Sequence, residues 1–122
     1  MNRLFIIFFI LLMPFSFELS GSKYDKDNPS ELYEKATKQL KNEKYKAALS
    51  TLKKYTKAEK DDADGWTLLA FTNRKLQNFS KAEELYEKAL MLEPNNKIAL
   101  EYQGELYVDC LLYTSDAADE VS

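Results

Sequence analysis

The most constraining feature of this chain is a pattern of small and large apolar residues between positions 63 and 96. In its first half these residues recur three and four positions apart, which is the spacing of one face of an α-helix. In its second half small and large residues alternate, so that two helices can approach closely, and a proline then stops the chain. We expect two closely packed helices, with these residues at their main positions: Trp66, Leu69, Ala70, Phe79, Ala82, Tyr86, Ala89 and Pro94.

The ends of these two helices carry local signals as well. Ser80 and Glu83 have the spacing of a capping box, in which two side chains satisfy free amides at the start of a helix. They predict that the second helix begins at Ser80, with Phe79 packing just before it. After Pro94, either Asn95 or Asn96 is expected to cap a further helix.

Weaker copies of the pattern lie on both sides of residues 63–96. The interval from Pro29 to Ala63 equals the interval from Ala63 to Lys97. Residues 29–62 open with a predicted cap at Asn28 and with Pro29 at the first helical position. This copy holds Leu32, Ala36, Tyr45, Ala48, Leu52 and Tyr55 at the corresponding places. Residues 97–109 contain only a first helix, with Leu100, Gly104 and Tyr107 at those places. Because a repeat buries its surface only against neighbours, this end of the array should be marginally stable.

The pattern resembles the tetratricopeptide repeat, a unit of about 34 residues built from two antiparallel helices. The resemblance implies an all-α fold in which helical hairpins stack as an α-solenoid, here with about two and a half repeats. It also implies binding of a protein partner. Lys35, Gln39 and Asn73 depart from the family, which has leucine or tyrosine there, and Lys60 replaces the closing proline of the first repeat. Such departures in the first repeat suit a terminal unit with one solvated face.

The resemblance further implies a concave groove along the first helices of the repeats. By repeat position it would be lined by Tyr33, Thr37, Leu40, Thr67, Phe71, Arg74, Glu101 and Glu105. The alternative is that these residues form ordinary helix surface. Phe71 is the strongest candidate for an anchor, since an aromatic side chain in a polar groove can dominate binding energy. Glu101 and Glu105 stand where repeats that clamp acidic chaperone tails carry cationic or amide side chains, so we expect no binding of such tails.

Residues 1–22 have the composition of an export signal. Arg3 precedes an almost unbroken apolar run from Leu4 to Phe17, which is short for a membrane-spanning helix. Residues 1–22 are therefore expected to be a signal peptide or, if uncleaved, a membrane anchor through residues 1–17, and residues 23–28 a linker. Ser22 occupies the place where a lipoprotein signal needs cysteine, so lipidation is not expected. The folded part would be periplasmic, secreted or membrane-anchored.

The C-terminal residues 110–122 break the periodic pattern. From Cys110 to Glu120 they resemble, residue for residue, one translated frame of an adapter used in transposase-based sequencing. We expect this segment to be non-native and the natural chain to continue differently after Asp109. The alternative is an ordinary polar C-terminal tail.

Composition excludes several classes of chemistry. The chain has 122 residues, a formal net charge of −3, no histidine and one cysteine. It lacks the basic surplus that neutralises phosphates in nucleic-acid binders. Without histidine it cannot form a histidine-based acid or base, and one cysteine cannot form a zinc cluster. We expect no enzyme activity, no cofactor, no metal and no nucleic-acid partner.

Three functions remain open from the sequence. The first is a noncatalytic adaptor in an exported or envelope-associated bacterial protein, which binds a peptide or a helix in its groove. The second is an accessory module at the N-terminus of a longer exported enzyme, such as a peptidase. The third is an intracellular assembly factor, for which the apolar run would be only a hydrophobic helix.

Overall fold

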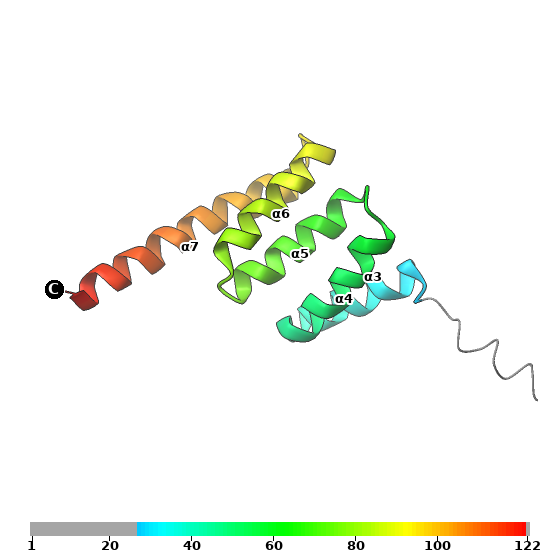
Figure 1. Ribbon diagram of the computed structural model, residues 1–122, viewed down its shortest axis with the longest axis horizontal. Helices are drawn as coiled ribbons and strands as arrows, with labels where there is room; N and C mark the ends of the chain where they lie inside the picture. The colour runs from blue at the N-terminus through cyan, green and yellow to red at the C-terminus, as the bar shows by residue number, and fades with distance from the viewer. Residues whose placement is uncertain (1–26, 122) are drawn as a thin grey trace, which may run out of the picture.

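The computed structural model describes residues 27–121, with side chains as far as residue 116. Within that range the chain is entirely helical (Figure 1). Its helices are α3 (Pro29–Lys41), α4 (Tyr45–Ala58), α5 (Ala63–Lys75), α6 (Phe79–Leu92) and α7 (Lys97–Val121). The predicted signal peptide lies outside the described residues. No helix in residues 27–121 combines the length and apolar character needed to cross a membrane.

The helices repeat at a constant interval. The first helix of each unit begins at residue 29, 63 or 97, and the second begins at residue 45 or 79. The helices α3 and α4 pack as one hairpin, α5 and α6 pack as the next, and α7 lies against both α5 and α6. The predicted all-α class and the repeat-like packing of hairpins are confirmed for the described residues.

Side chains cap the first helix of each unit. Asn28 accepts a hydrogen bond from the Ser30 amide at 3.1 Å, and Asp62 accepts one from the Asp64 amide at 3.1 Å. Asn96 accepts one from the Ala99 amide at 3.0 Å. The caps predicted at Asn28 and at one of the two asparagines after Pro94 are thus confirmed.

The capping box predicted at Ser80 is wrong. The helix α6 begins at Phe79, its cap position is Asn78, and that side chain makes no capping hydrogen bond. The Asn78 carbonyl already accepts a helical hydrogen bond from the Ala82 amide at 2.9 Å. Because the chain is helical before it reaches Ser80, this exposed side chain lies inside the first turn.

The same turn ends the first helix of both complete hairpins. Glu43 and Gln77, which occupy equivalent places in the two hairpins, have left-handed backbone conformations with φ of 58° and 64°. After α3, the Lys44 amide donates to the Gln39 carbonyl at 2.9 Å, and the Glu43 amide donates to the Leu40 carbonyl at 3.0 Å. Asn78 and Gln77 repeat these bonds after α5. This pairing satisfies the last carbonyls of a helix and reverses the chain into the next one.

The core lies between the hairpins and against α7. Its members are Ala36, Ala48, Leu52, Leu69, Ala70, Ala82, Leu85, Tyr86 and Leu106. Leu32, Tyr55 and Ala89 are buried as well. Trp66 is only half-buried; its Nε1 donates to the Lys60 carbonyl at 2.7 Å, and the Lys88 Nζ lies 3.8 Å from the ring centroid. Tyr45 and Phe79 are also only half-buried.

Four residues predicted at core positions are instead exposed. Leu100 and Tyr107 expose 48% and 46% of their surface, and Gly104 has no heavy atom within 4 Å of the place where a Cβ would lie. Tyr107 still reaches α6, where its hydroxyl donates to the Glu83 carboxylate at 3.4 Å. Pro94 is exposed too, because it follows the end of α6 at Leu92 and lies in the connecting loop.

The helix boundary predicted at Asp109 is also wrong. The helix α7 continues to Val121 and projects beyond the other helices (Figure 1). Residues 110–121 contain neither glycine nor proline and include several strong helix formers, so nothing local stops the helix. Whether this segment derives from an adapter stays a prediction.

Candidate functional site: the pocket between α3, α5 and α7

A shallow pocket of about 290 Å³ lies between the first helices of the three successive units. We call it the α3–α5–α7 pocket. Its lining residues are Thr37, Leu40, Lys41, Leu68, Phe71 and Tyr102. Apart from one threonine and one lysine they are apolar or aromatic. Such a lining suits the apolar side chain of a ligand.

Repeat geometry brings these residues together. Thr37 and Phe71 are separated by one repeat interval and so occupy equivalent places on α3 and α5. Leu68 and Tyr102 are related in the same way on α5 and α7. Side chains at equivalent places of stacked helices lie next to one another on one face of the array. The pocket is therefore a consequence of stacking rather than of any single repeat.

Two aromatic rings form one wall of the pocket. The centroids of Phe71 and Tyr102 lie 5.2 Å apart with their planes tilted by 37°. The Arg74 Cζ lies 5.2 Å from the Phe71 centroid and 5.8 Å from that of Tyr102. These distances allow both ring contact and attraction between the guanidinium and the ring faces. The wall thus joins α5 to α7.

Arg74 carries a buried charge behind this wall. Its side chain is 4% exposed, and its Nη1 lies 2.5 Å from the Glu105 Oε2. Its Nε makes no hydrogen bond with a described residue, but it lies 3.7 Å from the Asp109 Oδ2. Both carboxylates come from α7, so the charge of Arg74 is already matched within the protein. Arg74 therefore holds α7 in place and does not offer a free cation to a ligand.

The structure places only some of the predicted groove residues in the lining of this pocket. Thr37, Leu40 and Phe71 line the pocket together. Thr67 is buried and its Oγ1 donates to the Ala63 carbonyl at 2.8 Å, so its predicted place in the open groove is wrong. The predicted place of Arg74 in the open groove is wrong too, because its side chain is buried behind the rings. Whether any of these residues binds a ligand stays a prediction.

The remaining predicted groove residues lie outside the pocket lining. The Tyr33 ring packs on Tyr55, with centroids 5.2 Å apart. Glu105 is engaged by Arg74, whereas Glu101 is exposed. The expectation that the groove does not take an acidic chaperone tail is untested.

Tyr102, Leu68 and Lys41 line the pocket but were missed by the sequence interpretation. A signal for two of them was present. Leu68 and Tyr102 are large residues one repeat interval apart, which is the signature of a shared place in the stack. Lys41 follows a residue predicted for the groove, and only the packing of α3 against α5 shows that it faces the pocket.

Two exposed lysines lie near Phe71. Lys41 lines the pocket, whereas Lys75, whose Nζ lies 5.5 Å from the Phe71 centroid, does not line it and faces a neighbouring surface pocket with Glu105 and Asp109. Neither lysine forms an ion pair with another residue in the described part of the chain. Glu34 and Glu101 are exposed on α3 and α7, but they are not among the lining residues. Lys41 is thus the one charged side chain in the lining of this pocket.

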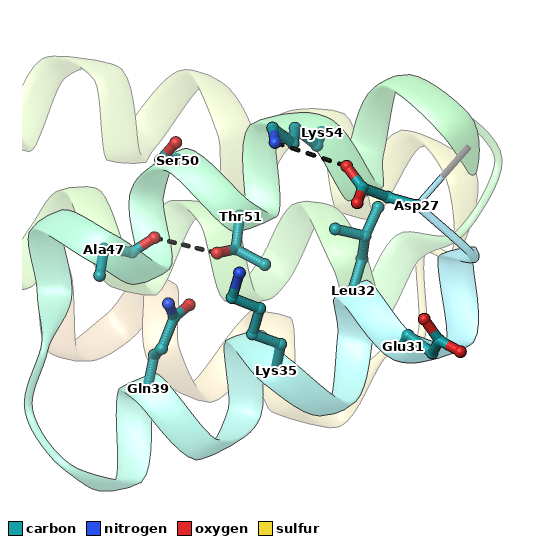
Figure 2. Close-up of a pocket in the computed structure, with 9 residues that line it drawn as sticks. All are labelled: Asp27, Glu31, Leu32, Lys35, Gln39, Ala47, Ser50, Thr51 and Lys54. Atoms are coloured by element: carbon teal, nitrogen blue, oxygen red, sulfur yellow. Dashed lines mark hydrogen bonds and ion pairs between the residues drawn. The ribbon is translucent and has the colours of Figure 1, made fainter. Parts of the chain in front are cut away.

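A second pocket, of about 390 Å³, lies on the outer side of the first hairpin (Figure 2). Polar side chains of α3 and α4 dominate it, and Lys54 reaches across its mouth to Asp27 at 3.4 Å. Lys35 and Gln39, predicted for a solvated face, both line it. An exposed ion pair of this kind contributes little free energy. Leu32 and Ala47 are the apolar side chains of this pocket, and the rest of its lining is polar or charged.

Two buried tyrosines in the same core have perturbed acidity. Burial raises the pKa of Tyr86, and the nearby Arg74 charge opposes that effect only in part. Burial also raises the pKa of Tyr55, whose hydroxyl donates to the Asp62 carboxylate. Both hydroxyls therefore stay protonated at neutral pH. The described side chains contain no cluster of three or more histidine, cysteine, aspartate or glutamate residues placed to hold a metal ion.

Comparison with known proteins identifies the repeat. Residues 63–96 match the family model of the tetratricopeptide repeat. The chain is 31% identical over 71 residues to superkiller complex protein 3 of Mus musculus and 31% identical over 68 residues to that of Homo sapiens. It is 29% identical over 68 residues to tetratricopeptide repeat protein 37 of Xenopus laevis.

These matches are local. The aligned segments cover 58%, 56% and 56% of this chain, and they span only 4% of the length of each relative. All three relatives are eukaryotic proteins. A tetratricopeptide repeat is therefore recognised at residues 63–96, inside the array of helical hairpins that the structure describes.

Proposed function

We propose that this chain is a noncatalytic scaffold that binds a peptide or a helix of a protein partner in the α3–α5–α7 pocket. The observation that carries the proposal is the open, largely apolar pocket on the stacked first helices of an array that contains one recognised tetratricopeptide repeat. Stacked helical repeats present extended concave surfaces, and such surfaces suit an elongated ligand. Phe71 is the proposed anchor because it lies at the middle helix of the three.

A second candidate function is that of an accessory module in a longer protein. The observation that favours it is the 4% coverage of the relatives, since the repeats of this chain correspond to a small part of much longer chains. In one version, the longer protein is an exported enzyme, such as a peptidase, and the repeats precede its catalytic domain. In another, it is an intracellular assembly factor. The eukaryotic relatives agree better with the second version than with a protein of a bacterial envelope.

The cellular setting remains a proposal in either case. An exported, periplasmic, secreted or membrane-anchored location depends on residues 1–22, which lie outside the described residues. The comparisons lend no support to a bacterial exported setting, because the relatives come from mouse, human and frog.

Site-specific photocrosslinking in cells tests the proposed function. A photoreactive phenylalanine derivative placed at position 71 keeps an aromatic ring in the pocket. The same derivative at Lys53, an exposed residue of α4 outside every ion pair described above, is the matched control. We expect crosslinked partner peptides from position 71 and few from position 53. Equal yields from the two positions, or none from position 71, would contradict the proposal.

A further inference from the structure

We propose that Asn78 is the acceptor site for an N-linked glycan when this chain passes through the secretory compartment of a eukaryotic cell. Asn78 opens the tripeptide Asn78-Phe79-Ser80, which has the sequence that transfer of such a glycan requires. This inference goes beyond the proposed scaffold function and does not depend on the α3–α5–α7 pocket. It depends instead on export of the chain, which is itself a proposal.

The sequence contains a second, similar tripeptide that serves as an internal contrast. Only Asn28 and Asn78 are followed by serine or threonine at the second position after them. Between Asn28 and Ser30 stands Pro29, and proline at that place prevents transfer. The Asn28 side chain is also engaged, since its Oδ1 accepts the hydrogen bond from the Ser30 amide that caps α3. Asn78 is therefore the one competent acceptor in the sequence.

The folded structure leaves Asn78 accessible. It is exposed in the turn between α5 and α6, at one end of the second hairpin (Figure 1). It occupies the cap position of α6, but its side chain makes no capping hydrogen bond. Its Nδ2 donates one long hydrogen bond, at 3.4 Å, to the Asn73 Oδ1. Because a glycosylated amide keeps one N–H, this bond can persist, and the start of α6 loses no hydrogen bond.

The place of Asn78 in the array also tolerates a large group. The equivalent residue of the first hairpin is Lys44, which is exposed as well. Both residues immediately precede the second helix of their hairpin, and neither belongs to the core between the hairpins. Asn78 does not line the α3–α5–α7 pocket or the pocket in Figure 2. A bulky, hydrated group at Asn78 is thus compatible with the fold and with an open pocket.

The reaction is a glycosyl transfer from an oligosaccharide that is linked to a lipid through pyrophosphate. The Asn78 Nδ2 attacks the anomeric carbon of the first sugar, so that a carbon–nitrogen bond forms and the bond from that carbon to the pyrophosphate oxygen breaks. The lipid pyrophosphate leaves, and the amide nitrogen releases one proton. The transferase of the cell supplies the catalytic groups, while Ser80 supplies the hydroxyl by which the tripeptide is recognised.

The test expresses the full chain in cultured mammalian cells in two forms. The first form keeps residues 1–22, and the second form replaces them with a secretion signal of the host. We expect the second form to give a slower band on a denaturing gel, and peptide-N-glycosidase to restore the mobility of the unmodified chain. Because that enzyme converts the attachment residue, mass spectrometry should then find aspartate in place of Asn78.

Substitutions in the second form locate the attachment. Asn78→Gln and Ser80→Ala should each abolish the slower band, whereas Ser80→Thr should keep it, since threonine also provides the hydroxyl. Asn28→Gln is the matched control and should leave the band unchanged. Secretion of the second form without a glycan at Asn78, or a slower band that persists in Asn78→Gln, would overturn the inference.

The first form separates the acceptor site from the export on which it depends. A glycan on both forms would support the inference together with export through residues 1–22. A glycan on the second form alone would support Asn78 as an acceptor and would contradict that export. Photocrosslinking at position 71 is measured separately, so neither result decides the scaffold function.

Discussion

At the residue scale, Arg74 carries a buried charge that pairs with two carboxylates of α7. Its guanidinium lies behind the rings of Phe71 and Tyr102 and is balanced by Glu105 and Asp109, which are 48% and 42% exposed. Both carboxylates are therefore much more exposed to solvent than the arginine is. Removing the arginine leaves carboxylates that water can solvate, whereas removing the carboxylates leaves a buried cation without a counterion.

This asymmetry gives a prediction for paired variants. Arg74→Met keeps apolar volume next to the rings and should lower the free energy of unfolding by no more than about 1.5 kcal/mol. The double variant Glu105→Gln, Asp109→Asn should lower it by about 3 kcal/mol, since the buried charge loses both partners. Urea unfolding monitored by circular dichroism measures both values.

A surface ion pair serves as the control. Asp27→Asn removes the partner of Lys54, where both side chains are more than half exposed, and should cost less than about 1 kcal/mol. If Arg74→Met costs more than the double carboxylate variant, the account of Arg74 as a buried charge held by α7 is wrong.

At the element scale, the two glycines within helices have opposite surroundings. A Cβ at Gly65 in α5 would lie 2.6 Å from the Tyr55 Cε1 and 2.9 Å from its Cδ1. That ring is buried and its hydroxyl is held by Asp62, so it has little freedom to move away. A Cβ at Gly104 in α7 would meet no heavy atom within 4 Å. Close approach of α4 to α5 therefore requires the first glycine and not the second.

The two alanine substitutions should change stability in opposite directions. Gly104→Ala should raise the free energy of unfolding by up to about 1 kcal/mol, which is the difference in helix propensity. Gly65→Ala gains the same propensity but forces the ring aside, and overpacking of this kind costs about 1 to 3 kcal/mol. We expect a net loss of about 1 kcal/mol for Gly65→Ala, once the gain in propensity is subtracted.

Chemical denaturation of the two variants and of the unsubstituted chain measures these changes in the free energy of unfolding. Tyr55→Phe in the Gly65→Ala background is a useful further variant, because it frees the ring from Asp62 and should recover part of the loss. A stabilising Gly65→Ala would show that the contact between α4 and α5 is looser than the structure indicates.

At the scale of the whole molecule, stability should fall toward the end of α7. The helices α5 and α6 have neighbours on both sides, whereas residues 111–116 of α7 are exposed throughout. An isolated helical segment of this length is marginal in water, and repeats are stabilised mainly by their neighbours. The core contacts of α7 end with Leu106 and Cys110.

Hydrogen exchange followed by mass spectrometry tests this gradient. Amides of α5 and α6 should exchange slowest, and amides beyond residue 110 should exchange within seconds at neutral pH. Exchange at two protein concentrations separates the single chain from an association of copies. Strong protection beyond residue 110 at both concentrations would contradict the expected gradient.

Local sequence by itself determined the class of this protein. The constant repeat interval, the small and large residues around Ala82 and Tyr86, and the caps expected at Asn28 and at Asn95 or Asn96 were sufficient to predict paired helices, and the resemblance to a repeat family implied that their hairpins stack. These signals act over one or two helical turns, where side-chain spacing and capping chemistry decide the outcome. The start of α6 was predicted wrongly from the same kind of signal, because the turn through Gln77 makes the chain helical before Ser80.

Tertiary structure alone decided which of the predicted groove residues face a ligand. Thr67 and Arg74 have the right repeat positions but are buried, while Tyr102 and Lys41 complete the pocket from neighbouring helices. It also decided that Leu100, Gly104 and Tyr107 are exposed. The physical reason is that burial depends on what packs against a helix, and a periodic pattern specifies the face of a helix without specifying the neighbour that covers it.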